Sequence, residues 1–424
     1  ADSLYKIAAP GSYYLTGNVT GVAGKHGIEI VSSGVTLDLN GFDLVGVPGM
    51  GAFDGVSVTV DSLRGVTVRD GSVRNWGDGG VDLGFLSRGC RVEGVLASGN
   101  AGTGITSSIS STVTNCTSSF NGQRGIFSSN GSTISNCSVE SNTGNGIQVN
   151  NGCTVANSSA YFNTGDGLLT GIGCTIVDCT AFQNMADGIQ LGETSTATRC
   201  SATNNSGHGF NASDSCAITD STASYNDSSG IHAERDSTIS GCTARSNGSS
   251  GINSTIGATI RGCASSANSG NGISVGNGVV VDCRTTENDF DGIRTTGGAT
   301  VMNCNSSNNA NNGIDTLGFG LISGNNCASN GNGAAEGHGI RCTGIGARII
   351  GNICSFNDHG ISVSISQNFI VGNSCKSNTI DWVIGANNAI GPILDRRNPG
   401  GAAVSGFSAP TTLNTTDPHA NFSH

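Results

Sequence analysis

The amino-acid sequence predicts an all-β fold, a parallel β-helix or solenoid with about 21 residues per turn. Three observations predict it. Between residues 100 and 309 the chain repeats itself about every 21 residues, and a fixed period of this length is typical of stacked supersecondary units. Each unit is rich in Ser, Asn, Gly and β-branched residues. No run of ten residues follows the 3.6-residue period of an amphipathic helix, which excludes helical repeats.

An asparagine recurs at one place in each unit, and a Gly followed by an apolar residue comes four residues later, as in Gly125-Ile126. Stacked Asn amides can bond to one another as a ladder, and Asn tolerates a left-handed bend. We expect the glycine to supply a second bend, and the apolar residue to pack inward on its neighbours. The asparagines are Asn100, Asn121, Asn142, Asn163, Asn184, Asn205, Asn226, Asn247, Asn268, Asn288 and Asn309.

Residue composition and the regularity of the repeat divide one solenoid domain into five segments. Residues 1–26 hold three of the five Tyr and are predicted to cap the open strand edges of the coil. Residues 27–91 alternate apolar and polar positions and form irregular first turns, residues 92–309 form the regular 21-residue β-helix, and residues 310–395 form looser turns. Residues 396–424 are a polar tail without a strand pattern. The tail either folds back along its own coil or docks on a neighbouring subunit, and the second arrangement would let the ends join into a filament.

The composition of the chain limits its possible binding partners and its cellular location. The net charge of −11 argues against a nucleic-acid partner, because phosphate binding needs a basic surface. No apolar run reaches 18 residues, so we expect no membrane span. Sixteen cysteines are more typical of an exported protein than of a cytosolic one, and the chain opens at Ala1 without Met, as a secreted protein does after cleavage. We therefore expect a secreted or cell-surface protein.

The cysteines follow the repeat and form two columns. Stacked neighbours lie within the Cα separation that a disulfide accepts, roughly 4.4 to 6.8 Å, so cysteines of adjacent turns are candidates for bridges. The alternative is a buried ladder of free thiols, since Cys packs as a small hydrophobe. Zinc is not expected, because the sequence has no CxxC pair. The candidate bridges are Cys116 with Cys137, Cys153 with Cys174, Cys179 with Cys200, Cys242 with Cys263, Cys283 with Cys304, and Cys354 with Cys375.

Several stretches carry a family resemblance. The segments GSYYLTGNVTG, GVTLDLNGFDLVG and GVTVRDGSVRNWGDGGVDL, together with the DPHANFSH ending, resemble secreted right-handed parallel β-helix repeat proteins of the pectate-lyase-like superfamily. The resemblance implies a right-handed solenoid and an extracellular setting. Enzymes on this superfold mostly cleave or epimerise acidic polysaccharides, whereas other members are adhesins or structural proteins, so the resemblance does not choose a function.

A candidate site lies in the densest charged stretch of the chain. A uronic-acid lyase needs a cation or an Arg for the substrate carboxylate and a base near the C5 proton. The repeat places Arg294 between Ser274 and Asp315 in an outward-facing column, with Arg341 one turn further on. This column is either a groove that carries an acid and a base, with calcium as its optional cofactor, or a set of surface ion pairs. The candidate residues are Asp289, Asp291, Arg294 and Asp315.

Two other features have plainer explanations. His232, Glu234, Arg235 and Asp236 form a second charged cluster that fits a solvated surface equally well. The Gly-His-Gly triplets around His208 and His338 are similar to a motif of polygalacturonase-type glycosidases. However, the paired-Asp and Arg-x-Lys motifs of that family are absent, so we interpret both histidines as turn residues.

Two functions remain open at this level. Few Trp and Tyr are available as sugar platforms, and an acidic protein repels acidic glycans. These points favour a non-enzymatic extracellular structural or surface protein that self-associates through its ends and tail. The alternative is a polysaccharide lyase or epimerase with an acidic glycan as its partner.

Overall fold

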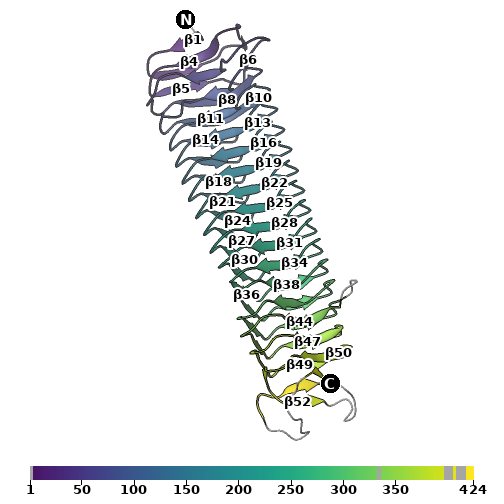
Figure 1. The fold of residues 1–424 in the computed structure, drawn as a ribbon. Coiled ribbons are helices and arrows are strands. Elements are labelled where there is room, and N and C mark those ends of the chain that lie inside the picture. The colour runs from purple at the N-terminus through teal and green to yellow at the C-terminus, as the bar shows by residue number, and fades with distance from the viewer. Residues whose placement is uncertain (1–2, 332–335, 396–403, 407–416) are drawn as a thin grey trace. The chain divides into compact units, whose positions relative to one another are not determined.

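The structure is a computed structural model that describes residues 3–331, 336–395, 404–406 and 417–424. The remaining residues of the predicted tail, and Ala1 and Asp2 of the predicted cap, lie outside the described residues. The chain divides into two compact units, Ala1–Cys216 and Ala217–His424. Each unit is a parallel β-solenoid whose successive turns lie one above the other (Figure 1). Among the described residues there is no helix that is long and apolar enough to cross a membrane.

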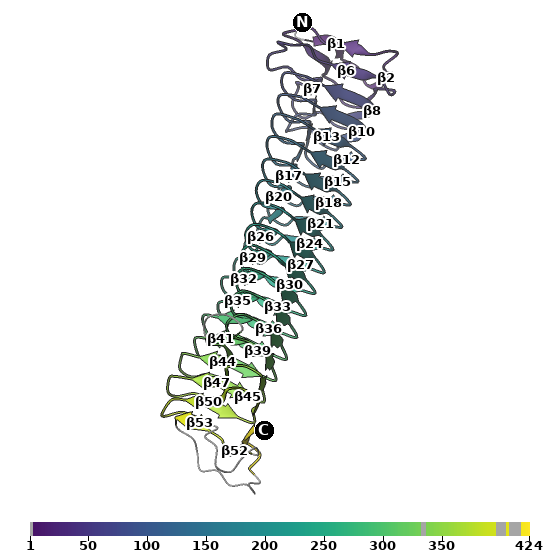
Figure 2. The same cartoon turned by 90° about the vertical axis from the view of Figure 1, so that its right-hand side faces the viewer.

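A regular turn contains three short strands, each paired in register with the same strand of the next turn. In the turn that begins after Asn121 these are β14 (Ile126–Ser128), β15 (Thr133–Ser135) and β16 (Ser138–Glu140). They pair in parallel with β17 (Ile147–Val149), β18 (Thr154–Ala156) and β19 (Ser159–Tyr161). Figure 2 shows the stack of β15, β18 and β21 (Thr175–Val177) face on. The 21-residue period predicted from the sequence is therefore the length of one turn.

The first strand of each turn contributes to one sheet face, which we call the site face because it carries the residues discussed below. In the first unit its strands are β1 (Ser3–Ile7), β4 (His26–Ile30), β7 (Val56–Val58), β9 (Val81–Asp82), β11 (Ile105–Ser107), β14, β17, β20 (Leu168–Thr170), β23 (Ile189–Leu191) and β26 (Phe210–Ala212). In the second unit they are β29 (Ile231–Ala233), β32 (Ile252–Ser254), β35 (Ile273–Val275), β38 (Ile293–Thr295), β41 (Ile314–Thr316), β44 (His338–Cys342), β47 (His359–Val363), β50 (Ile380–Ile384) and β53 (Val404–Gly406).

The predicted asparagine ladder is present in both units. The Nδ2 of Asn121 donates to Oδ1 of Asn142 at 2.9 Å, and Asn142 donates to Asn163 at 3.0 Å. In the second unit the same bonds join Asn226 to Asn247 and Asn247 to Asn268. Each Oδ1 also accepts the main-chain N–H of the preceding Asn, so these fully buried amides are satisfied. The asparagine side chains can be buried at little cost because their amides are hydrogen bonded within the ladder.

Both predicted bends are wrong in detail. The left-handed residue is the one before each ladder asparagine, such as Phe120 with φ 56° and Ser141 with φ 53°. Gly125 does not adopt the left-handed region. Its role is close approach, because a Cβ there would collide with Val139 Cγ1 and lie 2.8 Å from Gly146 O. The following Ile126 is buried and stacks on the apolar residues of the adjacent turns, as predicted.

The cysteines form buried columns, but the predicted disulfides are absent. All sixteen are buried free thiols, and most of them hydrogen bond to main-chain carbonyls, as Cys116 Sγ does to Thr114 O at 3.2 Å. In-register stacking keeps side chains parallel, so their Cβ atoms stay near the strand spacing of about 4.8 Å, whereas a disulfide draws them to about 3.8 Å. The pairs that are not bonded are Cys116–Cys137, Cys153–Cys174, Cys179–Cys200, Cys242–Cys263, Cys283–Cys304 and Cys354–Cys375.

The two ends of the chain are built into the coil. Strands β1, β2 (Gly11–Tyr14) and β3 (Val19–Thr20) pair with the next turn, so the segment predicted to cap the coil is itself a turn. At the other end β54 (Asn421–Ser423) lies between β49 (Ser374–Lys376) and β52 (Ile393–Asp395) and pairs with both. Asn421 accepts the amide of Asn373 at 3.2 Å, which continues a second asparagine ladder. These last residues of the tail therefore fold back on their own coil.

Candidate functional site

Two parallel columns of side chains run along the site face. The outward column consists of the middle residue of each three-residue strand, and its members stack in the predicted order: His232, Asn253, Ser274, Arg294, Asp315 and Arg341. The pre-glycine column consists of the residue just before each Gly–apolar pair. In the second unit it includes Asn271, Asp291, Asn312, His338 and His359. The two columns meet in one charged cluster on β38, β41 and β44.

The charged cluster brings together three of the four predicted site residues. Asp291 and Asp315 are almost completely buried, whereas Arg294 and Arg341 are exposed beside them. Arg341 Nη1 lies 3.8 Å from Asp315 Oδ1, and this oxygen has no hydrogen-bond partner. Asp291 is better satisfied, because its Oδ1 accepts both the N–H and the side-chain amide of Asn312. Asp315 is thus the less satisfied carboxyl of the two.

Burial sets the charge state of the two carboxyls. Loss of solvation raises the pKa of Asp315 to about 6, and repulsion from Asp291 adds to the rise, while Arg341 and Arg294 oppose it. Burial also raises the pKa of Asp291, against its hydrogen bonds to Asn312. A carboxyl that titrates near pH 6 beside two guanidinium groups can exchange a proton in the range where a general base works best.

The remaining charged candidates lie outside this cluster. Asp289 is exposed and lies outside the buried pair of carboxyls formed by Asp291 and Asp315. Glu234, Arg235 and Asp236 are also exposed and surround a corner where Asp236 has φ 55°. His232 Nδ1 lies 3.3 Å from the amide of Asn253. The second cluster has the geometry of a solvated corner, as the plainer interpretation predicted.

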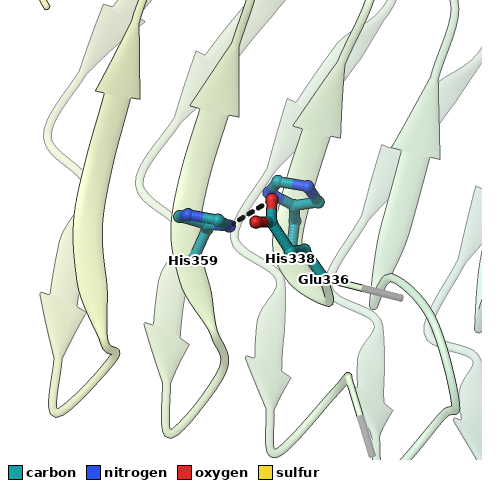
Figure 3. A group of neighbouring side chains, drawn as sticks. All are labelled: Glu336, His338 and His359. Carbon is teal, nitrogen blue, oxygen red and sulfur yellow. Dashed lines mark ion pairs between the residues drawn. The ribbon is translucent and has the colours of Figure 1, made fainter. Parts of the chain in front are cut away.

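A histidine pair lies on the next strands of the same face. His338 on β44 and His359 on β47 are in register, and their rings stack with centroids 4.7 Å apart and planes 19° apart. Figure 3 shows Glu336 reaching over this pair, with its Oε2 3.9 Å from His359 Nδ1. Both Nδ1 atoms are buried and have no hydrogen-bond partner. Burial, the second imidazole and Arg341 lower the pKa of His338 to about 4, so this ring is neutral at neutral pH.

Sequence reasoning missed the histidine pair, although the signal was present. GHGI at 337–340 and DHGI at 358–361 are one 21-residue turn apart. We interpreted His338 as a turn residue, and the structure shows that it begins a strand and stacks on a second histidine. His208 occupies the same pre-glycine position, but the side chain one turn earlier is Asp187, which accepts its N–H at 2.6 Å.

Aromatic side chains are also more available than the sequence suggested. Trp76 and Trp382 are buried and cannot serve as platforms. Phe120 and Phe162, which the count of Trp and Tyr overlooked, are 65% and 50% exposed. Phe162 contacts Tyr161 and Phe182 edge to face. In the second unit Tyr225 borders a surface pocket of about 430 Å³. The predicted scarcity of sugar platforms therefore no longer argues against a glycan partner.

The in-register turns, the asparagine ladders and the charged site face define a parallel β-helix protein. Comparison with protein families agrees with this class. The model of the right-handed beta helix region family matches residues 15–165 and 162–300, and the chain belongs to this family. The right-handed solenoid predicted from the sequence is thereby confirmed.

No curated protein matches the chain in sequence. Among solved structures, the A-module of the mannuronan C-5 epimerase AlgE6 of Azotobacter vinelandii is 12% identical, with a TM-score of 0.34 over 86% of this chain and 91% of that chain. Pectate lyase Pel9A is 15% identical, with a TM-score of 0.28 over 86% and 80%. A tailspike of E. coli bacteriophage HK620, solved with a pentasaccharide, is 12% identical, with a TM-score of 0.33 over 88% and 69%. With TM-scores this low, none of these likenesses bears on the function of the chain.

Proposed function

We propose that the protein acts on an acidic polysaccharide by removing the proton next to a uronate carboxylate, as a lyase or an epimerase. The observation that carries the proposal is the convergence of Arg294, Asp315 and Arg341 on adjacent strands. The two exposed guanidinium groups supply positive charge for a carboxylate on the face of an acidic protein. This local charge answers the objection that the net charge repels such a substrate.

The geometry suggests a role for each residue. Arg341 turns from Asp315 to the substrate carboxylate, which removes the cation that now lies 3.8 Å from Asp315 Oδ1. The freed carboxylate then accepts the C5 proton, while Arg294 and Arg341 stabilise the charge that develops on the substrate. In a lyase the bond from C4 to the leaving oxygen then breaks, a double bond forms between C4 and C5, and the leaving oxygen takes up a proton from solvent. In an epimerase solvent supplies a proton to C5 from the opposite face, and Asp315 releases its own proton to solvent.

Solvent exchange provides a test that covers both reactions. The full chain is incubated with polyuronates in D₂O, with and without calcium, and deuterium uptake at C5 is followed by NMR alongside the absorbance of unsaturated products. We expect Asp315→Asn to reduce turnover by about 10² or more, since general bases contribute about 10² to 10⁴. Asp289→Asn is the matched control, because Asp289 is exposed and outside the cluster.

The pH profile gives a second readout. Because Asp315 must be ionised to accept a proton, kcat/KM should rise with pH through about 6. Arg341→Ala should raise KM and move this midpoint upward, since the arginine opposes the rise in the pKa of Asp315. A chain that exchanges no C5 proton in any polyuronate, or an Asp315→Asn variant that is as active as Asp289→Asn, would refute the proposed function.

A structural role is the second candidate, favoured by ladders of buried asparagines in both units. The described end of the tail pairs with its own coil, so self-association would have to use other surfaces. Negative-stain electron microscopy at low and high protein concentration distinguishes the two candidates, because filaments support the structural role. A secreted location remains a prediction, and sixteen free thiols no longer favour export as disulfides would.

A further inference from the structure

Side chains of the pre-glycine column commonly accept a hydrogen bond from a main-chain N–H of the next turn. In the first unit Asp166 Oδ1 accepts the N–H of Asp187 at 3.0 Å, and Asp187 accepts the N–H of His208. A histidine can do the same, because His26 Nδ1 accepts the N–H of Asp54 at 3.0 Å. Both Asp and His at this position can therefore accept an N–H of the next turn.

His338 and His359 depart from this rule. The N–H of His359 donates to the main-chain carbonyl of Gly337, and the N–H of Ile380 donates to that of Asp358. Neither Nδ1 has a hydrogen-bond partner, although both atoms are buried. A buried imidazole nitrogen without a partner is costly, and two such nitrogens lie at adjacent levels of one face.

A carboxylate lies beside these two nitrogens. Glu336 Oε2 is 3.9 Å from His359 Nδ1, and one ligand atom from each of the three side chains lies within 4.8 Å of the others. The segment that carries Glu336 and His338 is held in place, because the N–H of Gly337 donates to Asp358 Oδ2 at 2.9 Å. The Glu336 side chain is 78% exposed, whereas that of His359 is only 12% exposed. Figure 3 shows the carboxylate of Glu336 beside the two rings.

We propose that Glu336, His338 and His359 bind a divalent transition-metal ion of the Zn²⁺ type. Two imidazoles and one carboxylate are a ligand set that such ions prefer, whereas Ca²⁺ takes six to eight oxygen ligands. Bonds of about 2.1 Å require ligand atoms about 3.4 Å apart, so the exposed Glu336 must close inward and the rings must rotate slightly. The ion satisfies both buried nitrogens and leaves a position open towards solvent.

The proposal is independent of the proposed glycan chemistry and has its own test. The full chain is treated with a chelator, dialysed and titrated with Zn²⁺ by calorimetry and with Co²⁺ by visible absorption, and Ca²⁺ serves as the contrasting ion. We expect one Zn²⁺ per chain and a Co²⁺ spectrum typical of four or five ligands. Glu336→Gln and His359→Asn should each weaken binding at least tenfold, since even outer partners of metal ligands contribute ten- to hundredfold.

The choice of the site variants and of the control keeps the metal-binding result interpretable. Glu336 is exposed and His359→Asn retains an acceptor at its position, so neither change should prevent folding, which circular dichroism checks. His208→Ala is the matched control, because His208 occupies the same column but follows an aspartate. The metal site is refuted if the parent chain takes up no stoichiometric Zn²⁺, or if Glu336→Gln and His359→Asn bind it as tightly as His208→Ala does.

Discussion

The pre-glycine column differs between two regions of the molecule. Between Asn145 and His208 each side chain accepts an N–H of the next turn, so the column acts as a third polar ladder. In the second unit Asp291 and Asn312 do the same, and Asn312 Oδ1 accepts the N–H of His338 at 3.1 Å. From His338 onward the ladder is replaced by main-chain bonds, and the side chains no longer support the coil.

In a repeat fold, the same position of a turn can hold a structural side chain in one region and a ligand-binding side chain in another. The glycine that follows the column is present in both regions, but around the histidines the strands are longer, since β44 and β47 begin at His338 and His359 and bond to the next turn through the main chain. Where that side chain is bonded to the next turn, its role is structural. Where the main chain takes over the bond, the side chain is available to a ligand, and His338 and His359 each have an unpartnered buried Nδ1 there.

The largest expected effect should be equal in the two regions. A Cβ on Gly146 would lie 2.7 Å from Gly167 O, and a Cβ on Gly339 would lie 2.7 Å from Gly360 O. We expect Gly146→Ala and Gly339→Ala each to destabilise the coil by about 3 kcal/mol, because the colliding atoms belong to the main chain. Thermal unfolding with hydrogen exchange of the affected turns measures this locally.

The control for this prediction is Gly152→Ala. Gly152 has φ +65°, but nothing lies within 4 Å of its Cβ position. Equivalent corners of other turns hold Ser110 and Thr194 in the same left-handed conformation. This change should cost about 1 kcal/mol. If the two buried glycines tolerate alanine as well as Gly152 does, the glycine is not required for close approach of the turns.

The second expected effect is a change in stability that differs between the two regions: a loss in the first and no loss in the second. Asp187→Ala removes the acceptor of the His208 N–H and of the Asn211 amide, and should cost about 1 to 3 kcal/mol. In contrast, His359→Asn removes an unpartnered buried nitrogen and should be neutral or slightly stabilising in metal-free buffer. Denaturant midpoints with constant slopes give both values. A large loss of stability in His359→Asn would show that the histidine pair supports the coil after all.

Much of this arrangement could be predicted because the repeat fixes the register. The position of Arg294 between Ser274 and Asp315 followed from counting 20 or 21 residues, and the structure confirms it. The disulfides and the corner conformations could not be predicted in the same way. They depend on Cβ directions and on which residue of a corner turns, and a period in the sequence determines neither.

The histidine pair was missed for a related reason. The turn that leads to His338 is longer than the turns of the regular coil, with 27 residues between Asn330 and Asn357, so its place in the stack was uncertain. Whether a side chain in a column is bonded to the next turn also depends on hydrogen bonds that residue types alone do not decide. His26 and His338 occupy the same position, yet only His26 accepts the next N–H through Nδ1.

The smallest expected effect concerns the ionisation of Asp166, which lies where the pre-glycine column is hydrogen bonded to the next turn. Burial, and then Asp187, raise the pKa of Asp166 to about 6 from 3.8. The folded chain therefore holds a proton that the unfolded chain has lost between these values, so this group makes stability fall as pH rises from about 4 to 6. Asp166→Asn keeps an oxygen for the N–H of Asp187 and should remove this fall. Its stability relative to the parent should increase by less than about 1.4 kcal/mol per pH unit, because solvent screens a half-buried group. Unfolding midpoints at pH 4, 5, 6 and 7 give the slope, and a difference that does not change with pH would mean that Asp166 stays ionised within the ladder.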